Sequence, residues 1–135
     1  MSGIFGMNIK MAIYGESHGK SIGVVLDGLP PGLALDEAAI AAEMARRAPG
    51  QNAFSTARKE SDMVEIQSGF FNGFTTGTPL CARIVNSDQH SKDYSILADK
   101  MRPGHADYAG HVRYQGFNDY RGGGHFSGRL TAPLV

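Results

Sequence analysis

Two segments near the start of the chain alternate apolar with polar side chains, a pattern typical of β-strands that bury one face. The segments are residues 8–14 and 21–27, and their apolar positions are Ile9, Met11 and Ile13, then Ile22, Val24 and Leu26. The intervening Gly15-Glu-Ser-His-Gly-Lys20 is polar and rich in turn-forming residues. The pattern therefore predicts a β-hairpin with a wide loop.

A helix is expected to follow the hairpin. Asp36 is a suitable N-cap residue, and Leu35 and Ile40 hold the two positions of a hydrophobic staple around it. Arg46-Arg47 would lie in the last turn, where positive charge complements the helix dipole. Pro49-Gly50 is then expected to end the helix.

Two more strands are expected at residues 63–67 and 80–85, joined by the turn-rich residues 68–79. The order strand, strand, helix, strand, strand predicts an α+β fold, in which a helix packs on antiparallel strands. The length fits a single domain over residues 1–135, with residues 1–86 as its sheet and helix core.

The pattern changes after Asn86. Residues 87–128 are polar, rich in glycine, tyrosine and histidine, and without a sustained period. Their aromatic content argues against disorder, and a long irregular stretch inside a domain is usually functional. We therefore expect residues 87–135 to form an active-site loop and a glycine-rich segment. The apolar end, Leu130–Val135, is expected to be a strand with an exposed edge, and more chain should follow it.

Composition narrows the classes of function. Thirteen basic residues balance thirteen acidic ones, which argues against general nucleic-acid binding. The single Cys81 cannot form an intramolecular disulfide, and neither a signal peptide nor a membrane-spanning stretch is visible, so we expect a cytoplasmic protein without a membrane partner. Eighteen of the 135 residues are glycine, a larger share than the usual ~7%. This excess indicates tight turns or close approach of the backbone to a ligand.

Gly15-Glu-Ser-His-Gly19 matches the G-x-S-x-G nucleophile elbow of serine hydrolases. That motif needs a strand before it and a helix after it, whereas here a strand pattern follows. A polar hairpin tip fits the sequence better. There His18 could act as a general acid or base, or be an exposed histidine without a role.

A second histidine lies in Arg102-Pro-Gly-His-Ala-Asp107, on a turn that proline and glycine constrain. Asp107 could orient the imidazole of His105. A metal site would have to recruit His90 and His111 as well, but these spacings match no standard zinc pattern, and we expect no metal.

Arg121-Gly-Gly-Gly-His-Phe-Ser-Gly-Arg129 is a glycine-rich loop between two arginines. Its backbone N–H groups could form an anion-binding nest, and arginine binds phosphate through two parallel hydrogen bonds. The alternative is a flexible linker, although linkers usually lack phenylalanine and paired arginines. Another basic grouping, at Arg46, Arg47, Arg58 and Lys59, is more simply ordinary surface charge.

Taken together, these segments resemble the chorismate synthase family. The motifs that carry the resemblance fall in the family's order: Gly15-Glu-Ser-His-Gly19 with Asp27-Gly-Leu-Pro-Pro-Gly32, Arg46-Arg-Ala-Pro-Gly-Gln51, Ser68-Gly-Phe-Phe-Asn-Gly73, Thr75-Thr-Gly-Thr-Pro79, Arg102-Pro-Gly-His-Ala-Asp-Tyr108 and Asp119-Tyr-Arg-Gly-Gly-Gly124. The resemblance runs from about Met7 to the last residue.

The resemblance implies an activity. The family converts 5-enolpyruvylshikimate 3-phosphate to chorismate and phosphate by an anti 1,4-elimination, the last common step of the shikimate pathway, and needs reduced FMN without net redox change. By this resemblance, His18 would protonate the departing phosphate and His105 would set the protonation of the reduced flavin. The implied substrate contacts are Arg47, Ser17 and Arg102, and the implied flavin contacts are His125, Phe126, Ser127 and Arg129.

The resemblance also implies a setting. The family fold is a sandwich of helices between antiparallel sheets, assembled as a homotetramer. Its flavin is reduced either by a separate flavin reductase or with NADPH. Family chains are more than twice as long, so this chain is expected to be their N-terminal portion, inactive alone. The alternative is a non-catalytic remnant that binds flavin or an anion.

Departures from the family pattern bear on the flavin and substrate sites. Many members read Arg-Ser-Ser-Ala-Arg where this chain reads His125-Phe-Ser-Gly-Arg129, which removes one fixed charge. Many also carry an arginine where this chain has Ala53. Both differences predict a local rearrangement of the contacts to anions.

Overall fold

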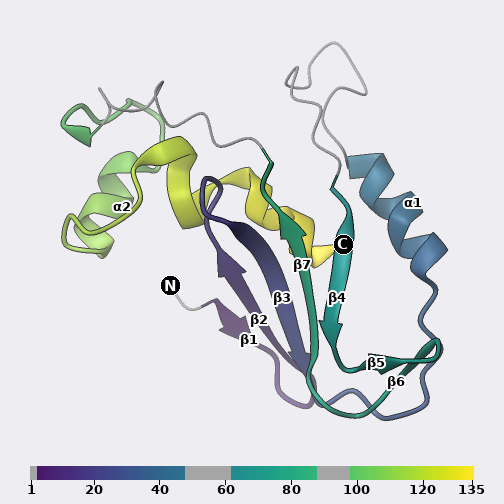
Figure 1. Ribbon diagram of the computed structural model, residues 1–135. Helices are drawn as coiled ribbons and strands as arrows, with labels where there is room; N and C mark the ends of the chain where they lie inside the picture. Colours follow the sequence, from purple (N-terminus) through teal and green to yellow (C-terminus); the bar gives the residue numbers. More distant parts are fainter. Residues whose placement is uncertain (1–2, 48–61, 88–97) are drawn as a thin grey trace.

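The computed structural model describes residues 3–47, 62–87 and 98–135, and Figure 1 shows their arrangement around one antiparallel sheet. The order of strands across this sheet is β1-β2-β3-β7-β4. The strands span Ile4–Phe5 (β1), Lys10–Gly15 (β2), Ser21–Asp27 (β3), Leu80–Val85 (β7) and Val64–Ser68 (β4). The four expected strands and their antiparallel pairing are therefore confirmed, and β3 and β7 have the expected bounds. The expected α+β fold is confirmed too.

Three strands were not expected from the sequence. β1 is a two-residue edge strand paired with β2. A small hairpin, β5 (Phe70–Phe71) and β6 (Phe74–Thr75), forms inside the segment that was expected to be loop. Asn72 and Gly73 at its tip both have positive φ, the geometry that a tight two-residue hairpin turn requires.

The register of the sheet gathers its apolar residues on one face. Ile22 pairs with Ile84, which pairs in turn with Val64, so three apolar side chains from β3, β7 and β4 lie side by side. The opposite face carries polar pairs such as Glu65 and Arg83, whose side chains form an ion pair of 2.8 Å. One face is thus built to be covered, and the other faces outward.

The first helix, α1 (Glu37–Arg47), helps to cover the apolar face. It begins where expected, because the Ala39 amide donates to Oδ1 of Asp36 at 2.9 Å. Met44 is buried, with Ile40 packed beside the same core cluster. The expected helix end at Pro49-Gly50 lies outside the described residues.

Beyond β7 the structure differs from the sequence expectation. A second helix, α2 (Asp107–Arg113), and a 3₁₀ segment, η2 (Arg121–Phe126), lie in the stretch that showed no period. A second 3₁₀ segment, η3 (Gly128–Leu134), forms at the apolar end. The expected strand at Leu130–Val135 is wrong. The amides of Leu130 and Val135 donate to local carbonyls, those of Ser127 and Ala132, at 3.0 and 3.3 Å, and Leu130 and Ala132 are buried. The apolar end packs across the face of the sheet and does not extend its edge.

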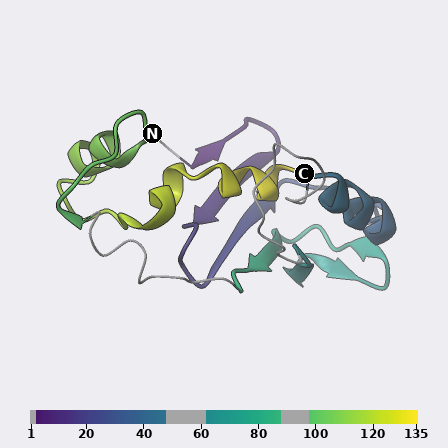
Figure 2. The same cartoon turned by 90° about the horizontal axis from the view of Figure 1, so that it is seen from above.

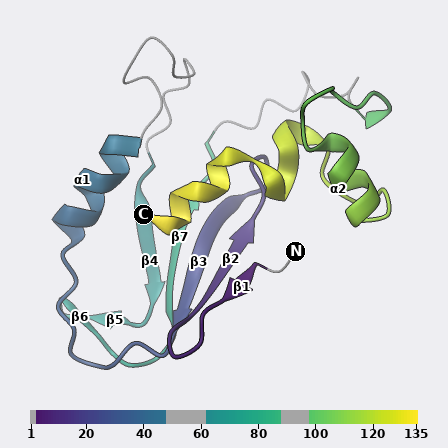
Figure 3. The ribbon, with the colours of Figure 1, turned by 180° about the vertical axis from the view of Figure 1, so that it is seen from behind.

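Figures 2 and 3 show η3 crossing the sheet, with α1 at one end of the same face and α2 at the opposite end of the molecule. The shared core consists of Ile22, Met44, Ile84, Leu130 and Ala132. In residues 3–47, 62–87 and 98–135, no helix is long and apolar enough to cross a bilayer. The segment η2 lies against the turn between β2 and β3, and that junction positions the candidate site.

Candidate functional site

The turn between β2 and β3 buries two polar side chains, Ser17 and His18, at 7% and 2% exposure. The turn is closed by its own backbone, since the Gly19 amide donates to the Glu16 carbonyl at 3.0 Å. It is joined to η2 because the Ser17 amide donates to the Gly124 carbonyl at 3.1 Å. The exposed hairpin-tip histidine considered from the sequence is therefore wrong: His18 is held inside the molecule.

Three consecutive glycines in η2 have positive φ: +54° at Gly122, +92° at Gly123 and +54° at Gly124. A Cβ at Gly122 would lie 2.2 Å from Cε1 of His18, and one at Gly123 would lie 3.1 Å from Cε1 of His105. The two imidazoles, which lie far apart in the sequence, therefore contact adjacent residues of one backbone segment. This segment, Gly122–Gly124 of η2, is called the glycine strand below, although it is not a β-strand. Only glycine permits both this backbone conformation and this approach.

Hydrogen bonds orient the ring of His18. The Ser17 hydroxyl donates to the carbonyl of Arg121 at 3.3 Å, and its oxygen lies 3.0 Å from Nδ1 of His18. Because that hydroxyl proton is already used, Nδ1–H of His18 is the donor in the second contact. Nε2 is then the ring nitrogen whose proton can be exchanged with a ligand.

His105 sits in a charged triad with Asp107 and Arg102. Nδ1 of His105 lies 2.7 Å from Oδ1 of Asp107, and Arg102 donates to both carboxylate oxygens at 2.8 Å. Nη2 of Arg102 also lies 3.2 Å from Nδ1. A guanidinium only donates, so the shorter contact to the carboxylate favours a protonated Nδ1. The hydrogen bonds from Arg102 outweigh burial and hold the pKa of Asp107 well below its usual range.

Asp119 and Arg121 form a bidentate pair beside His18, with contacts of 2.8 and 2.7 Å. Burial alone would raise the pKa of Asp119. The hydrogen bonds and charge of Arg121, together with the charge of His18, outweigh burial and lower it. The same pair raises the pKa of Arg121, mainly through its hydrogen bond to Asp119. The role of Asp119 was missed in the sequence, although its motif had been noticed.

Arg47 and Arg129, expected to serve substrate and flavin separately, meet on one carboxylate. Arg47 donates to Oδ2 of Asp62 at 2.5 Å, and Arg129 donates to Oδ1 at 2.8 Å. The Asp62 side chain is 2% exposed. Two guanidinium groups thus share one buried negative charge, which leaves the cluster of three with a net charge of +1. Asp62 had no distinguishing signal in the sequence.

The other expected flavin contacts, His125, Phe126 and Ser127, each contact a different part of the fold. Nδ1 of His125 lies 2.8 Å from the Gly15 carbonyl, which fixes η2 to the end of β2. The Phe126 ring packs on Tyr114 with centroids 5.8 Å apart, toward α2. The Ser127 hydroxyl accepts from the Arg129 amide at 3.3 Å and caps η3. All three therefore make contacts that shape the loop itself.

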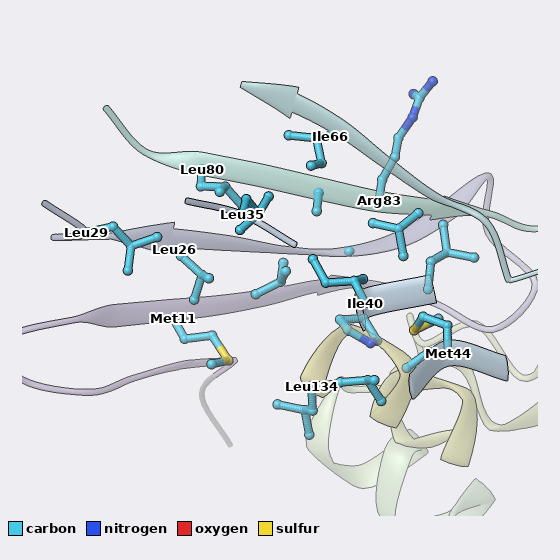
Figure 4. Close-up of a pocket in the computed structure, with 18 residues that line it drawn as sticks. Met11, Leu26, Leu29, Leu35, Ile40, Met44, Ile66, Leu80, Arg83 and Leu134 are labelled. Atoms are coloured by element: carbon cyan, nitrogen blue, oxygen red, sulfur yellow. The ribbon is translucent and has the colours of Figure 1, made fainter. Parts of the chain in front are cut away.

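Pockets of different character lie near these elements. A groove of about 650 Å³ runs beside the β2–β3 turn, and its lining includes Glu16, Lys20, Phe117 and His125. A second pocket of about 320 Å³, shown in Figure 4, lies between the apolar face of the sheet, α1 and η3. Apart from Arg83, its lining is apolar, and it includes neither His18 nor His105, so its chemistry is that of an unfilled core. A third, much smaller pocket is lined by Asp107, Asp119 and Gly123 of the candidate site, and it shares Glu16 and His125 with the polar groove.

The serine-hydrolase interpretation fails on context, because β3 and not a helix follows Gly15–Gly19. The other expectations at Ala53, Arg58, Lys59 and His90 lie outside the described residues.

Comparison with known proteins bears on the same residues. The family model described as chorismate synthase matches residues 9–135. A chorismate synthase from Cytophaga hutchinsonii is 52% identical over 135 residues, covering 100% of this chain and 37% of that protein. One from Paraburkholderia xenovorans is 55% identical over 136 residues, covering 100% of this chain and 37% of that protein. A crystal structure of chorismate synthase superposes with a TM-score of 0.63 at 30% identity, covering 94% of this chain and 31% of that one.

The chain thus spans about 37% of the length of the curated relatives that it matches. Within that span, the agreement covers the hairpin with buried His18, the turn that carries His105, and the glycine strand. The resemblance drawn from the sequence motifs is confirmed, and the chain belongs to the chorismate synthase family.

Proposed function

We propose that the full-length protein carrying this sequence is a chorismate synthase, a lyase that removes phosphate from 5-enolpyruvylshikimate 3-phosphate. The observation that supports this most is the convergence of His18 and His105 on adjacent glycines of one backbone strand. An elimination of this kind breaks one C–O bond and one C–H bond, forms a second ring double bond, and releases phosphate and a proton. Two proton-carrying groups at one site, the buried His18 and the more exposed His105, suit such a reaction.

His18 is the proposed acid for the departing phosphate. Its Nδ1–H is engaged by Ser17, so the proton for the leaving group would come from Nε2. Phosphate is a poor leaving group unless its developing charge is matched, and an imidazolium supplies both a proton and a positive charge. Ser17 would keep the ring in this orientation.

His105 is the proposed proton carrier on the other side of the glycine strand. Asp107 accepts from Nδ1 and would orient the ring, and the hydrogen bonds from Arg102 hold the pKa of Asp107 low, so that its carboxylate stays ionised. The proposed role of Arg102 in binding substrate is thereby weakened, because its guanidinium is committed to Asp107. Arg47 is also bound to a carboxylate, that of Asp62, but it shares this carboxylate with Arg129, so the cluster keeps a net positive charge that suits an anionic substrate.

Reduced FMN is the proposed cofactor, and the residues present fit it. When bound, it supplies the electron-rich ring system that this elimination requires without net redox change. The glycine strand allows close approach, and Arg129 carries positive charge beside η3. The groove of about 650 Å³, which lies within the usual size of cofactor sites, meets this segment at His125. His125, Ser127 and Arg129 are the proposed contacts to it, and Phe126 shapes the loop through Tyr114. Of the three, His125 lines the groove, and Arg129 would contribute its charge while bound to Asn86 and Asp62.

The assembly and setting follow the family. We propose a homotetramer, a cytoplasmic location, and reduction of the flavin by a flavin reductase or with NADPH. Balanced charge and a single cysteine are consistent with that setting.

The test is an anaerobic assay of the full-length protein with photoreduced FMN and 5-enolpyruvylshikimate 3-phosphate, following chorismate by its absorbance. His18→Ala should lower kcat roughly 10²- to 10⁴-fold, the usual span for losing an acid or base. His111→Ala, at an exposed histidine, is the matched control and should retain wild-type kcat. Binding of FMN without any chorismate would favour the non-catalytic alternative, and a change under about threefold would remove His18 from the mechanism.

A further inference from the structure

Asn86, immediately after β7, holds the turn that carries His18. The residue is 5% exposed. Its Nδ2 donates to the carbonyl of Glu16 at 3.1 Å and to the carbonyl of Gly19 at 2.8 Å. These two carbonyls bracket Ser17 and His18, so one side chain fixes both ends of the turn.

The other side of the same amide faces an arginine. Oδ1 of Asn86 accepts from Nε of Arg129 at 2.8 Å, and Nη1 of Arg129 donates to Asp62 at 2.8 Å. Both amide protons and the amide oxygen of Asn86 are therefore engaged. Reversing the amide would set its oxygen against two carbonyl oxygens, so the partners determine its orientation.

We propose that Asn86 is a positioning residue, which sets the place of His18 by connecting its turn to the Arg129–Asp62–Arg47 cluster. The proposal rests on the proposed function for its kinetic consequence, but not for its structural one. Asn86 does not contact the imidazole; it acts through the backbone on each side. An aspartate at this position would lack the two N–H donors and would place negative charge against two carbonyl oxygens.

Thr75 offers a matched control elsewhere in the fold. It is also 5% exposed, and its hydroxyl also bridges a turn: it donates to the Pro30 carbonyl at 2.7 Å and accepts from the Leu33 amide at 3.0 Å. Thr75 lies in β6, on the small hairpin remote from η2. Thr75→Val therefore removes buried hydrogen bonds of the same kind without touching the His18 turn.

The kinetic test compares Asn86→Leu, Asn86→Asp and Thr75→Val in the full-length protein with reduced FMN. A displaced acid slows the chemical step more than it weakens binding, so both Asn86 variants should lose about 10- to 100-fold in kcat with a much smaller change in KM. Thr75→Val should keep wild-type kcat. Wild-type kcat in Asn86→Asp, or an equal loss in Thr75→Val, would overturn the proposal.

The structural test needs no activity. Diethyl pyrocarbonate modification of His18, followed by mass spectrometry and normalised to exposed His111, reports access to the imidazole. Both Asn86 variants should raise the rate at His18 several-fold while thermal unfolding stays cooperative, and Thr75→Val should not. If Asn86→Leu does not fold, Asn86→Asp decides. If wild-type protein makes no chorismate, the proposed function fails, whereas an unchanged labelling rate in the Asn86 variants refutes the role of Asn86.

Discussion

Gly122 and Gly123 are the residues through which two distant histidines come to share a site. Each has a φ that residues other than glycine rarely adopt. At each, an imidazole lies close to the place that a Cβ would occupy. These two residues serve the site because they have no Cβ. A single methyl group at Gly122 would occupy the space of the His18 ring.

Gly122→Ala should cost activity in the full-length protein. The substituted Cβ would lie 2.2 Å from Cε1 of His18, and the left-handed backbone adds about 1–2 kcal/mol of strain. We expect kcat to fall roughly 100-fold, as for displacement of a catalytic group by an ångström. Gly128→Ala in the same glycine-rich segment is the control, since no atom lies within 4 Å of its added Cβ. Equal kcat in the two variants would contradict the contact.

At the scale of elements, α1 depends on one capping hydrogen bond for its start. Asp36→Ala removes the acceptor for the Ala39 amide and should lower the free energy of unfolding by about 0.5–2 kcal/mol. Asp36→Ser keeps a capping oxygen, so its loss in the free energy of unfolding should be only a few tenths of the loss in Asp36→Ala. Urea unfolding followed by circular dichroism measures both; an equal loss in the two variants would show that the side-chain cap is not the cause.

The elements that the sequence predicted are those with a regular period. Residues 21–27 carry an apolar side chain at every second position, residues 80–85 are a short, mainly apolar run after a turn-rich segment, and the structure forms strands with those bounds. The hairpin of β5 and β6 was missed because its strands are two residues long, too short for a period to appear. Leu130–Val135 was mistaken for a strand because its apolar character comes from packing across the sheet, which a linear pattern does not distinguish from pairing at an edge.

The candidate site was only partly predictable for a related reason. His18 and His105 can be singled out in the sequence as histidines on glycine-rich turns. Their contacts with neighbouring glycines depend on the φ angles of Gly122 and Gly123, which the spacing of residues along the chain does not encode. Asp62 and Asn86 gave no signal because their roles come from contacts made across the fold. Family motifs supplied the roles that residue chemistry alone left open.

At the scale of the whole molecule, paired carboxylates make stability depend on pH. The pKa of Asp107 is depressed in the folded state, mainly by its hydrogen bonds from Arg102. Folding thus gains stability at pH values above the unfolded pKa of about 3.9, and loses it as pH falls toward the lower folded value. Asp119 acts in the same direction.

Urea unfolding of the full-length protein at about pH 6 and about pH 3.5 measures this dependence. Asp107→Asn should lower the free energy of unfolding by about 1–3 kcal/mol at the higher pH and by less at the lower. Glu43→Gln, in an exposed pair with Arg46, should leave both values unchanged. The same loss for Asp107→Asn at both pH values would mean that the carboxylate charge is not responsible.

The contact between Ser17 and Arg121 joins residues 104 positions apart. Ribosomes add roughly 5–20 residues per second, so a nascent chain waits about 5 to 20 s between making the histidine turn and making the glycine strand that encloses it. During that interval the contacts of η2 with Ser17 cannot form, because Arg121 and Gly124 have not yet been made. The site therefore cannot be complete until several seconds after the ribosome has added His18.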